Sequence, residues 1–162
     1  MKAYVSLGSN LGDRAGNLLL GIRGMLGANL EVIRLSHIYE TEPVETFAQP
    51  AFLNMVAELG GNRLPRPEEL MARLLRIEYA LGRKRDVAMA PRTIDLDLLF
   101  YQDQTSATEF LHLPHPRLHQ RRFVLEPLNE LVPKFVHPIF RKTIGELLEQ
   151  LDDDSDVRLW RA

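Results

Sequence analysis

Two aspartates, Asp95 and Asp97, are separated by one residue in the segment PRTIDLDLLFY at 91–101. If this segment is a β-strand, successive side chains alternate between its faces, so both carboxylates project from the same face. Neighbouring carboxylates repel each other unless a cation lies between them, and Mg²⁺ binds oxygen ligands while keeping waters and substrate phosphates in its coordination shell. We therefore predict a metal–phosphate site here. The alternative is a strand face with two solvated aspartates.

Basic clusters lie before and after this acidic segment. Arg83 to Arg85 and Arg92 precede the aspartates, and Arg117 to Arg122 follow them. A guanidinium group presents several N–H donors in a geometry that matches phosphate oxygens, so both clusters favour an anionic ligand. The formal net charge of the chain is only −2, which argues against extensive contact with a nucleic acid. A compact polyphosphate is the predicted ligand, and solvated surface arginines are the alternative.

Aromatic and amide side chains could bind a flat heterocycle beside such phosphates. Phe52 and Asn54 are two residues apart in a predicted strand and therefore share a face. Phe123 follows the second basic cluster. An aromatic ring can stack on a heterocycle and an amide can hydrogen-bond to its edge. The alternatives are an aromatic core and a surface amide.

The segment GSNLG at 8–12 marks the junction of a predicted strand and helix. Backbone N–H groups at such a junction can bind an anion, and a tight turn with a helix cap is an equally good interpretation. The segment matches neither the dinucleotide-binding fingerprint nor the P-loop pattern. The sequence therefore excludes a Rossmann or P-loop nucleotide site at this position.

Length and composition favour a single compact unit. The chain has 162 residues and no cysteine, which excludes disulfide bonds, thiolate metal sites and cysteine nucleophiles. No apolar run is long enough for a signal peptide or for a bilayer span. We expect residues 1–162 to form one soluble, cytoplasmic and monomeric domain that contacts neither membrane nor nucleic acid.

The predicted elements follow one another in the order β-α-β-β-α-β. Alternation and helical spacing predict strands at 2–7, 30–39, 52–59 and around Asp95, and helices at 13–26 and 67–81. This order is that of a ferredoxin-like α+β fold, with an antiparallel sheet and helices packed mainly on one face.

Two further segments complete the predicted organisation. The proline-containing segment 40–51 has the composition of a lid or binding loop. Residues after 102 form a C-terminal extension, in which helices are predicted at 123–131 and 143–151.

Five short blocks are distributed over nearly the whole chain. They are GSNLG at 8–12, QPAFLN at 49–54, IE at 77–78 with GR at 82–83, PRTIDLD at 91–97, and PH at 114–115 with RRFVL at 121–125. In this combination, order and spacing they resemble the 6-hydroxymethyl-7,8-dihydropterin pyrophosphokinases of folate biosynthesis.

The resemblance implies an enzyme that transfers pyrophosphate from ATP to the hydroxymethyl oxygen of the dihydropterin and releases AMP. It implies two Mg²⁺ ions, with Asp95 and Asp97 as the ligands of both. The implied catalytic residues are Arg83, Arg92, Asp95 and Asp97. The implied ATP-binding residues are Glu78, Arg85, Ile94, His115 and Arg121. The implied pterin-binding residues are Thr41, Pro43, Val44, Phe52, Asn54 and Phe123.

The chain departs from the family pattern in the loop before Pro91. Ala88, Met89 and Ala90 stand where the family usually has a basic residue followed by Trp-Gly, and Phe52 replaces a frequent Tyr. These changes leave open a paralogue that binds nucleotide or pterin without the transfer. A ferredoxin-like RNA-binding module is a third class, disfavoured by the near-neutral charge and by the lack of an RNA-reading aromatic motif.

Overall fold

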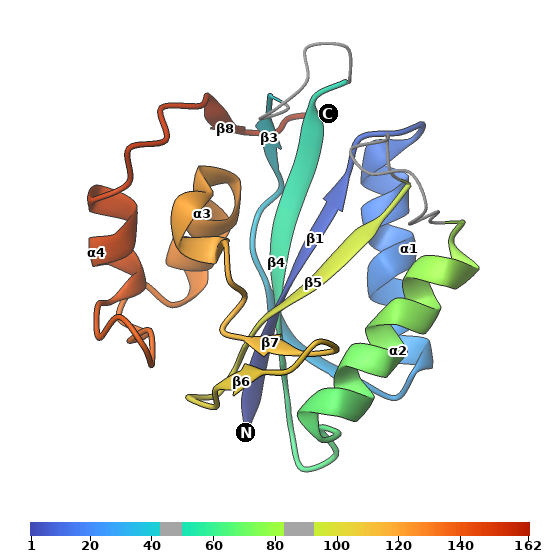
Figure 1. The fold of residues 1–162 in the computed structure, drawn as a ribbon. Coiled ribbons are helices and arrows are strands. Elements are labelled where there is room, and N and C mark those ends of the chain that lie inside the picture. The colour runs from blue at the N-terminus through green and yellow to red at the C-terminus, as the bar shows by residue number, and fades with distance from the viewer. Residues whose placement is uncertain (43–49, 83–92) are drawn as a thin grey trace.

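The computed structural model describes residues 1–42, 50–82 and 93–162 (Figure 1). Its strands are β1 (Lys2–Ser9), β2 (Glu31–Leu35), β3 (Tyr39–Thr41), β4 (Phe52–Gly60), β5 (Asp95–Tyr101), β6 (Ser106–Ala107), β7 (His112–Leu113) and β8 (Val157–Leu159). Its helices are α1 (Arg14–Gly27), α2 (Pro67–Ala80), α3 (Arg122–Leu131) and α4 (Ile144–Glu149), with a 3-10 turn at Leu118–Gln120. Within these ranges, none of the helices combines the length and apolar character that a membrane span requires.

The main sheet is antiparallel throughout. Its strands pair in the order β5-β1-β4-β3-β8, and β2 also pairs with β4. The first helix connects β1 to β2, and the second connects β4 to β5, which is the connectivity of the ferredoxin-like fold. The predicted α+β class is therefore confirmed. Because β1 and β4 are central, the residues at their ends lie in the middle of the sheet.

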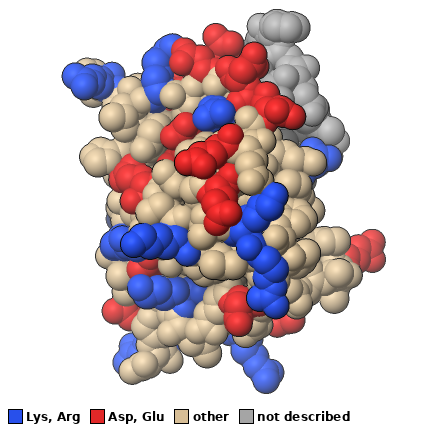
Figure 2. Space-filling model, turned by 90° about the vertical axis from the view of Figure 1, so that its left-hand side faces the viewer, with Lys and Arg blue, Asp and Glu red and all other residues tan. Residues whose placement is uncertain are grey.

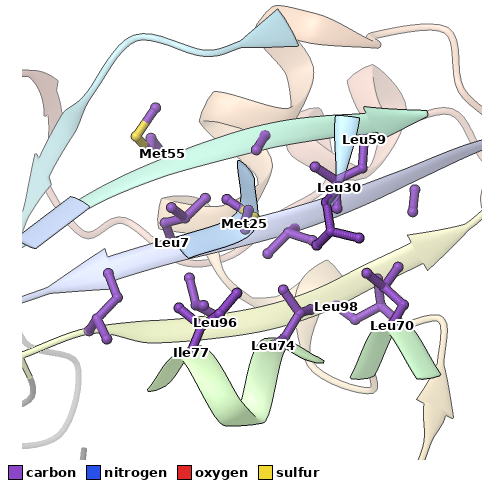
Figure 3. Close-up of a cluster of buried hydrophobic side chains, with 14 of the residues drawn as sticks. Leu7, Met25, Leu30, Met55, Leu59, Leu70, Leu74, Ile77, Leu96 and Leu98 are labelled. Carbon is purple, nitrogen blue, oxygen red and sulfur yellow. The ribbon is translucent and has the colours of Figure 1, made fainter. Parts of the chain in front are cut away.

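One face of the sheet packs against α1 and α2. Alternate residues of β1, such as Val5 and Leu7, point to this side and are fully buried. On the α2 side, Leu74 and Ile77 lie against Leu96 of β5 (Figure 3). This layer is the two-helix face that the fold class predicts.

The opposite face is covered by the C-terminal extension. Tyr4 of β1 and Val56 of β4 point to this side and form a second buried cluster with Val124 and Leu125 of α3 and with α4. The sheet thus lies between two helical layers (Figure 1). The predicted helices α1 and α2 occupy one face, and the extension supplies the other.

The helix boundaries follow local signals that the sequence contains. Asp13 caps α1 by accepting a hydrogen bond from the Gly16 N–H at 3.1 Å. Pro67 occupies the first position of α2, and Gly82 follows that helix with a φ of 90°, a conformation that glycine adopts without steric cost. Both helices were predicted within a residue or two of these bounds.

The prediction of one continuous strand at 30–39 is wrong. Residues 36–38 separate β2 from β3, although both strands pair with β4. Ser36 donates its backbone N–H to the Val56 carbonyl, and its hydroxyl accepts the Val56 N–H, each at 2.9 Å. The side chain thus takes the place of a backbone acceptor, and the regular ladder is interrupted there.

Two further differences concern the ends of the sheet. Gly8 and Ser9 were predicted as a turn, but β1 continues through Ser9 and pairs on both sides at Gly8. The strand β8, in the acidic C-terminal tail, was not predicted at all. It adds to the edge of β3, and a three-residue strand carries too little hydrophobic pattern to be recognised from sequence.

Candidate active site

The predicted metal-binding aspartates lie beside a central strand of the sheet. Asp95 is opposite Gly8 of β1, and Asp97 is opposite Ser6. On the other side of β1, Gly8 is opposite Asn54 of β4. Residues directly opposite each other share a face, and this face is the one covered by α3. The register therefore places both aspartates on the same face as Asn54, with a glycine between them.

The amide of Asn54 is held in a fixed orientation. Its side chain is 3% exposed, and its Nδ2 donates a hydrogen bond of 2.9 Å to Oγ1 of Thr41. Thr41 in turn is opposite Phe52 in the β3–β4 ladder. The structure thus brings together three predicted pterin-binding residues at the end of the sheet.

Gly8 provides space that any other residue would fill. A Cβ atom built on Gly8 would lie 2.8 Å from Oδ1 of Asn54 and 3.8 Å from Cδ1 of Phe52. The first distance is too short for a real Cβ contact, so a side chain here would displace the Asn54 amide. Sequence reasoning missed this residue as a site residue. The signal was a glycine at a strand end, which often marks close approach of another group.

His115, Arg121 and Phe123 lie before or at the start of α3, the helix that packs on this face of the sheet. The Arg121 guanidinium carbon lies 5.5 Å from the centre of the Phe123 ring, within the range of a cation–π contact. Phe123 is half-buried at the start of α3. These two predicted ligand residues, two positions apart in the sequence, are therefore neighbours in space.

His115 is a neutral imidazole in this arrangement. Burial, the largest cause, and the nearby charge of Arg121 together lower its pKa to about 4, although the carboxylate of Asp95 acts in the opposite direction. Its Nδ1 accepts a hydrogen bond from the Arg117 N–H at 3.2 Å, so its proton is on Nε2. The backbone N–H of His115 donates to the Leu99 carbonyl at 2.9 Å, which places this residue beside β5, the strand that carries both aspartates.

Two of the predicted ATP-binding residues belong to the other side of the strand. Ile94 is completely buried in the cluster under α1 and α2, so only its backbone is available to a ligand on the α3 face. Glu78 is 1% exposed, and its Oε2 accepts the Leu96 N–H at 2.7 Å. Because Leu96 lies between Asp95 and Asp97, Glu78 fixes the backbone that carries both aspartates.

Replacing this buried carboxylate is expected to weaken the fold. Glu78→Leu leaves the Leu96 N–H without its acceptor, which costs about 1–3 kcal/mol of unfolding free energy. For a chain of this size we expect the melting temperature to fall by about 2–10 °C. Tyr79→Leu is the matched control, since Tyr79 is the next residue of α2 and is 83% exposed. Equal melting temperatures of Glu78→Leu and the control would contradict this role.

Five of the predicted site residues lie outside the described residues. They are Pro43, Val44, Arg83, Arg85 and Arg92. Their predicted roles remain predictions, as do those of the altered loop residues Ala88, Met89 and Ala90.

The donor set at the end of β5 fits magnesium. Among the described residues, no group of three or more histidines and carboxylates comes together as a complete metal cage. Mg²⁺ does not require one, since one or two carboxylates with waters and substrate phosphates satisfy its octahedral shell. Asp95 and Asp97 are both half-buried on one face of β5. Carboxylates in this arrangement suit a metal bound together with a phosphorylated substrate.

Comparison with known proteins agrees with this geometry. A family model described as 7,8-dihydro-6-hydroxymethylpterin-pyrophosphokinase matches residues 4–133. The chain is 38% identical over 143 residues to a protein of Aquifex aeolicus named 2-amino-4-hydroxy-6-hydroxymethyldihydropteridine pyrophosphokinase, with 88% of each chain covered. It is 39% identical over 160 residues to the Bacillus subtilis protein of the same name, covering 98% of this chain and 90% of the relative.

Other relatives are longer proteins in which this chain corresponds to one part. It is 39% identical over 150 residues to the folic acid synthesis protein fol1 of Pneumocystis carinii, covering 93% of this chain but only 20% of that protein. The crystal structure of Plasmodium falciparum HPPK-DHPS with pteroate has the same fold, with a TM-score of 0.71, 15% identity, and coverage of 92% of this chain and 44% of that one. The fold, the paired aspartates and these matches lead to one conclusion: the chain belongs to the 7,8-dihydro-6-hydroxymethylpterin-pyrophosphokinase family, enzymes of folate synthesis that use ATP, generally with magnesium, to transfer pyrophosphate to hydroxymethyldihydropterin.

Proposed function

We propose that residues 1–162 act as a single pyrophosphokinase domain in which Asp95 and Asp97 hold two Mg²⁺ ions. The observation that carries this proposal is the register of β5, β1 and β4, which sets both carboxylates on one face with Asn54. A magnesium–triphosphate site and a heterocycle site on the two sides of β1 are what a transfer between ATP and a pterin requires. Bound metal would neutralise charge on the phosphate oxygens.

The pterin would bind where Phe52, Asn54 and Thr41 meet the start of α3. Stacking between Phe52 and Phe123 suits a flat bicyclic ring. The Asn54 amide, oriented by Thr41, can hydrogen-bond to the ring edge. Pro43 and Val44, which lie outside the described residues, are proposed to add backbone contacts to that edge.

The nucleotide would bind on the side of Arg121 and His115. The Arg121 guanidinium can pair with phosphate oxygens, and a neutral His115 can donate from Nε2 or pack against the base without adding charge. Arg83, Arg85 and Arg92 are proposed as further phosphate-binding residues, from the sequence. Glu78 acts through the backbone of β5, and Ile94 through its own backbone.

In this arrangement the chain's residues accomplish the transfer by positioning and charge stabilisation. The hydroxymethyl oxygen attacks the β-phosphorus of ATP, and the bond from that phosphorus to the bridging oxygen of the α-phosphate breaks. AMP leaves with that bridging oxygen, and the hydroxyl proton passes to solvent. The arginines stabilise the negative charge that develops, and no covalent enzyme intermediate is needed.

The enzyme is proposed to work as a monomer. A cytoplasmic location is proposed because a chain without cysteine suits a reducing compartment. No observation favours a paralogue that binds the substrates without transfer, or an RNA-binding module.

The decisive experiment measures AMP. Purified protein is incubated with ATP, Mg²⁺ and 6-hydroxymethyl-7,8-dihydropterin, and AMP formation is followed with a coupled assay. We expect AMP only when the pterin and Mg²⁺ are both present, with one pterin diphosphate formed for each AMP. Tight binding of Mg-ATP without AMP release would instead support the non-transferring paralogue.

A further inference from the structure

The acidic C-terminal tail connects two elements that carry predicted pterin-binding residues. It runs from the end of α4 past α3 and then pairs with β3 as β8 (Figure 1). Phe123 belongs to α3, and Thr41 belongs to β3. The tail therefore contacts both of these elements, although no step of the proposed reaction uses its residues.

Asp153 is the tail residue that contacts the N-terminus of α3. Its Oδ2 accepts a hydrogen bond of 3.1 Å from the backbone N–H of Arg122, and its backbone oxygen accepts one of 2.8 Å from Arg122 Nε. Arg122 is the first residue of α3, and Arg121 at the N-cap makes no side-chain hydrogen bond to the helix. Asp153 thus supplies, from the tail, the cap that the local sequence lacks, with the charge that a helix N-terminus favours.

The Asp153 carboxylate is itself held in place. Its Oδ1 accepts the Ser155 N–H at 2.9 Å. Burial opposes ionisation of this carboxyl, but the hydrogen bonds from Ser155 and Arg122 outweigh it and hold the pKa of Asp153 below its ordinary value. Asp153 is therefore a fixed anion at neutral pH and a rigid anchor for the helix.

The other end of the tail supports β3. Val157 of β8 is opposite Thr41, whose hydroxyl orients the Asn54 amide. Arg158 donates to Oε1 of Glu40 at 3.2 Å. With β8 in place, β3 has a pairing partner on both sides, so the strand that holds Thr41 is not left as a frayed three-residue edge.

Asp153 differs from the other acidic residues around it. Acidic side chains gather at the end of the molecule where the tail runs from α4 to β8 (Figure 2). Asp152, Asp154 and Asp156 are exposed, whereas Asp153 is half-buried against α3. If the tail acted only through its negative charge, all four of these aspartates would contribute. It is Asp153, however, whose carboxylate accepts the Arg122 N–H of α3.

We propose that Asp153 is a positioning residue for the pterin site. By capping α3 at Arg122 it sets the position of Arg121 and Phe123, the two residues that flank Arg122, relative to the β3–β4 side of the site. The inference rests on the proposed function, because Phe123 matters only if a pterin stacks on it. Small displacements of a positioning group have large effects on binding and turnover.

The test compares Asp153→Ala with Asp153→Asn and Asp154→Ala in the full chain. We expect Asp153→Ala to raise the KM for hydroxymethyldihydropterin about fivefold to tenfold with kcat changed less than about twofold, the signature of lost ground-state binding. Asp153→Asn keeps an oxygen that can cap the helix, so its KM is expected within about twofold of wild type. Asp154→Ala removes the same charge from an exposed neighbour and should change neither constant.

The outcomes separate this inference from the proposed function. A wild-type protein that forms no AMP rejects the proposed function, whereas an active wild type with an unchanged pterin KM in Asp153→Ala rejects the positioning role. A lower kcat at an unchanged KM, which a smaller folded fraction would also produce, overturns the proposal as well. Emission from Trp160, the single tryptophan of the chain, reports whether β8 remains docked.

If circular dichroism shows that Asp153→Ala does not fold, Asp153→Glu is tested in its place. Asp153→Glu keeps the charge but moves the carboxylate by one methylene. It is expected to raise the pterin KM about threefold or more, because the cap geometry changes while the electrostatics do not. An unchanged KM in a folded Asp153→Glu protein would reject the proposal.

Discussion

Asp97→Asn is expected to remove almost all pyrophosphate transfer while the protein stays folded. The substitution replaces an anionic ligand by a neutral amide of nearly the same size, on the strand face where Asp97 is opposite Ser6. Losing a metal ligand at the phosphates removes several kcal/mol of charge stabilisation, which corresponds to a rate loss of about 10³-fold. The melting temperature is expected to change by less than about 3 °C, because the shape of the side chain is preserved.

The measurement is the initial rate of AMP formation, together with thermal melting and direct titration of Mg-ATP. Asp103→Asn is the matched control, since Asp103 follows β5 closely, is exposed and is not a predicted site residue. We expect the control to retain full activity and Asp97→Asn to lose Mg-ATP binding. If Asp97→Asn kept wild-type turnover, the aspartate pair would not be the metal site.

Gly8→Val is expected to impair pterin use far more than nucleotide binding. The new Cβ would lie 2.8 Å from Oδ1 of Asn54, and the two methyl groups would need further space near Phe52. Asn54 is buried and bonded to Thr41, so it cannot move without losing that bond and its orientation. Losing about two hydrogen bonds to the pterin, at roughly 1–1.5 kcal/mol each, lowers kcat/KM for the pterin about 10²-fold.

Gly27→Val tests whether the effect is specific to this position. Gly27 is the last residue of α1, and a Cβ built there has no heavy atom within 4 Å. We expect this control to keep its kcat/KM for the pterin, and we expect Gly8→Val to titrate Mg-ATP like wild type. A Gly8→Val enzyme with an unchanged pterin KM would show that the space beside Asn54 does not receive the substrate.

Asp97→Asn and Gly8→Val are expected to affect different substrates because of their positions in the sheet. Asp97 and Gly8 lie on adjacent strands, but the nearest atoms to a Cβ on Gly8 belong to Asn54 and Phe52 of β4, not to β5. Asp97→Asn therefore disturbs the metal side of the site, and Gly8→Val disturbs the heterocycle side. Opposite patterns in Mg-ATP titration and pterin kinetics would locate the two substrates on the two sides of β1.

Much of this architecture could be predicted from the sequence because the signals are local. The spacing of Asp95 and Asp97 places both carboxylates on one strand face, and the two long helices have caps and periodicity that define their bounds within a residue or two. The element order then gives the ferredoxin-like fold. Phe52 and Asn54 share a face for the same reason as the aspartates.

The remaining features depend on contacts between residues far apart in the chain. The position of Gly8 between Asp95 and Asn54 is a matter of strand register, and the capping of α3 by Asp153 joins residues 31 positions apart. Glu78 was predicted as an ATP-binding residue, and the hydrogen bond that it accepts from the Leu96 N–H appears only in the folded chain. Strand register, helix caps supplied by distant residues and the partner of a buried carboxylate are set when elements pack together. A local pattern of residue types therefore does not predict them.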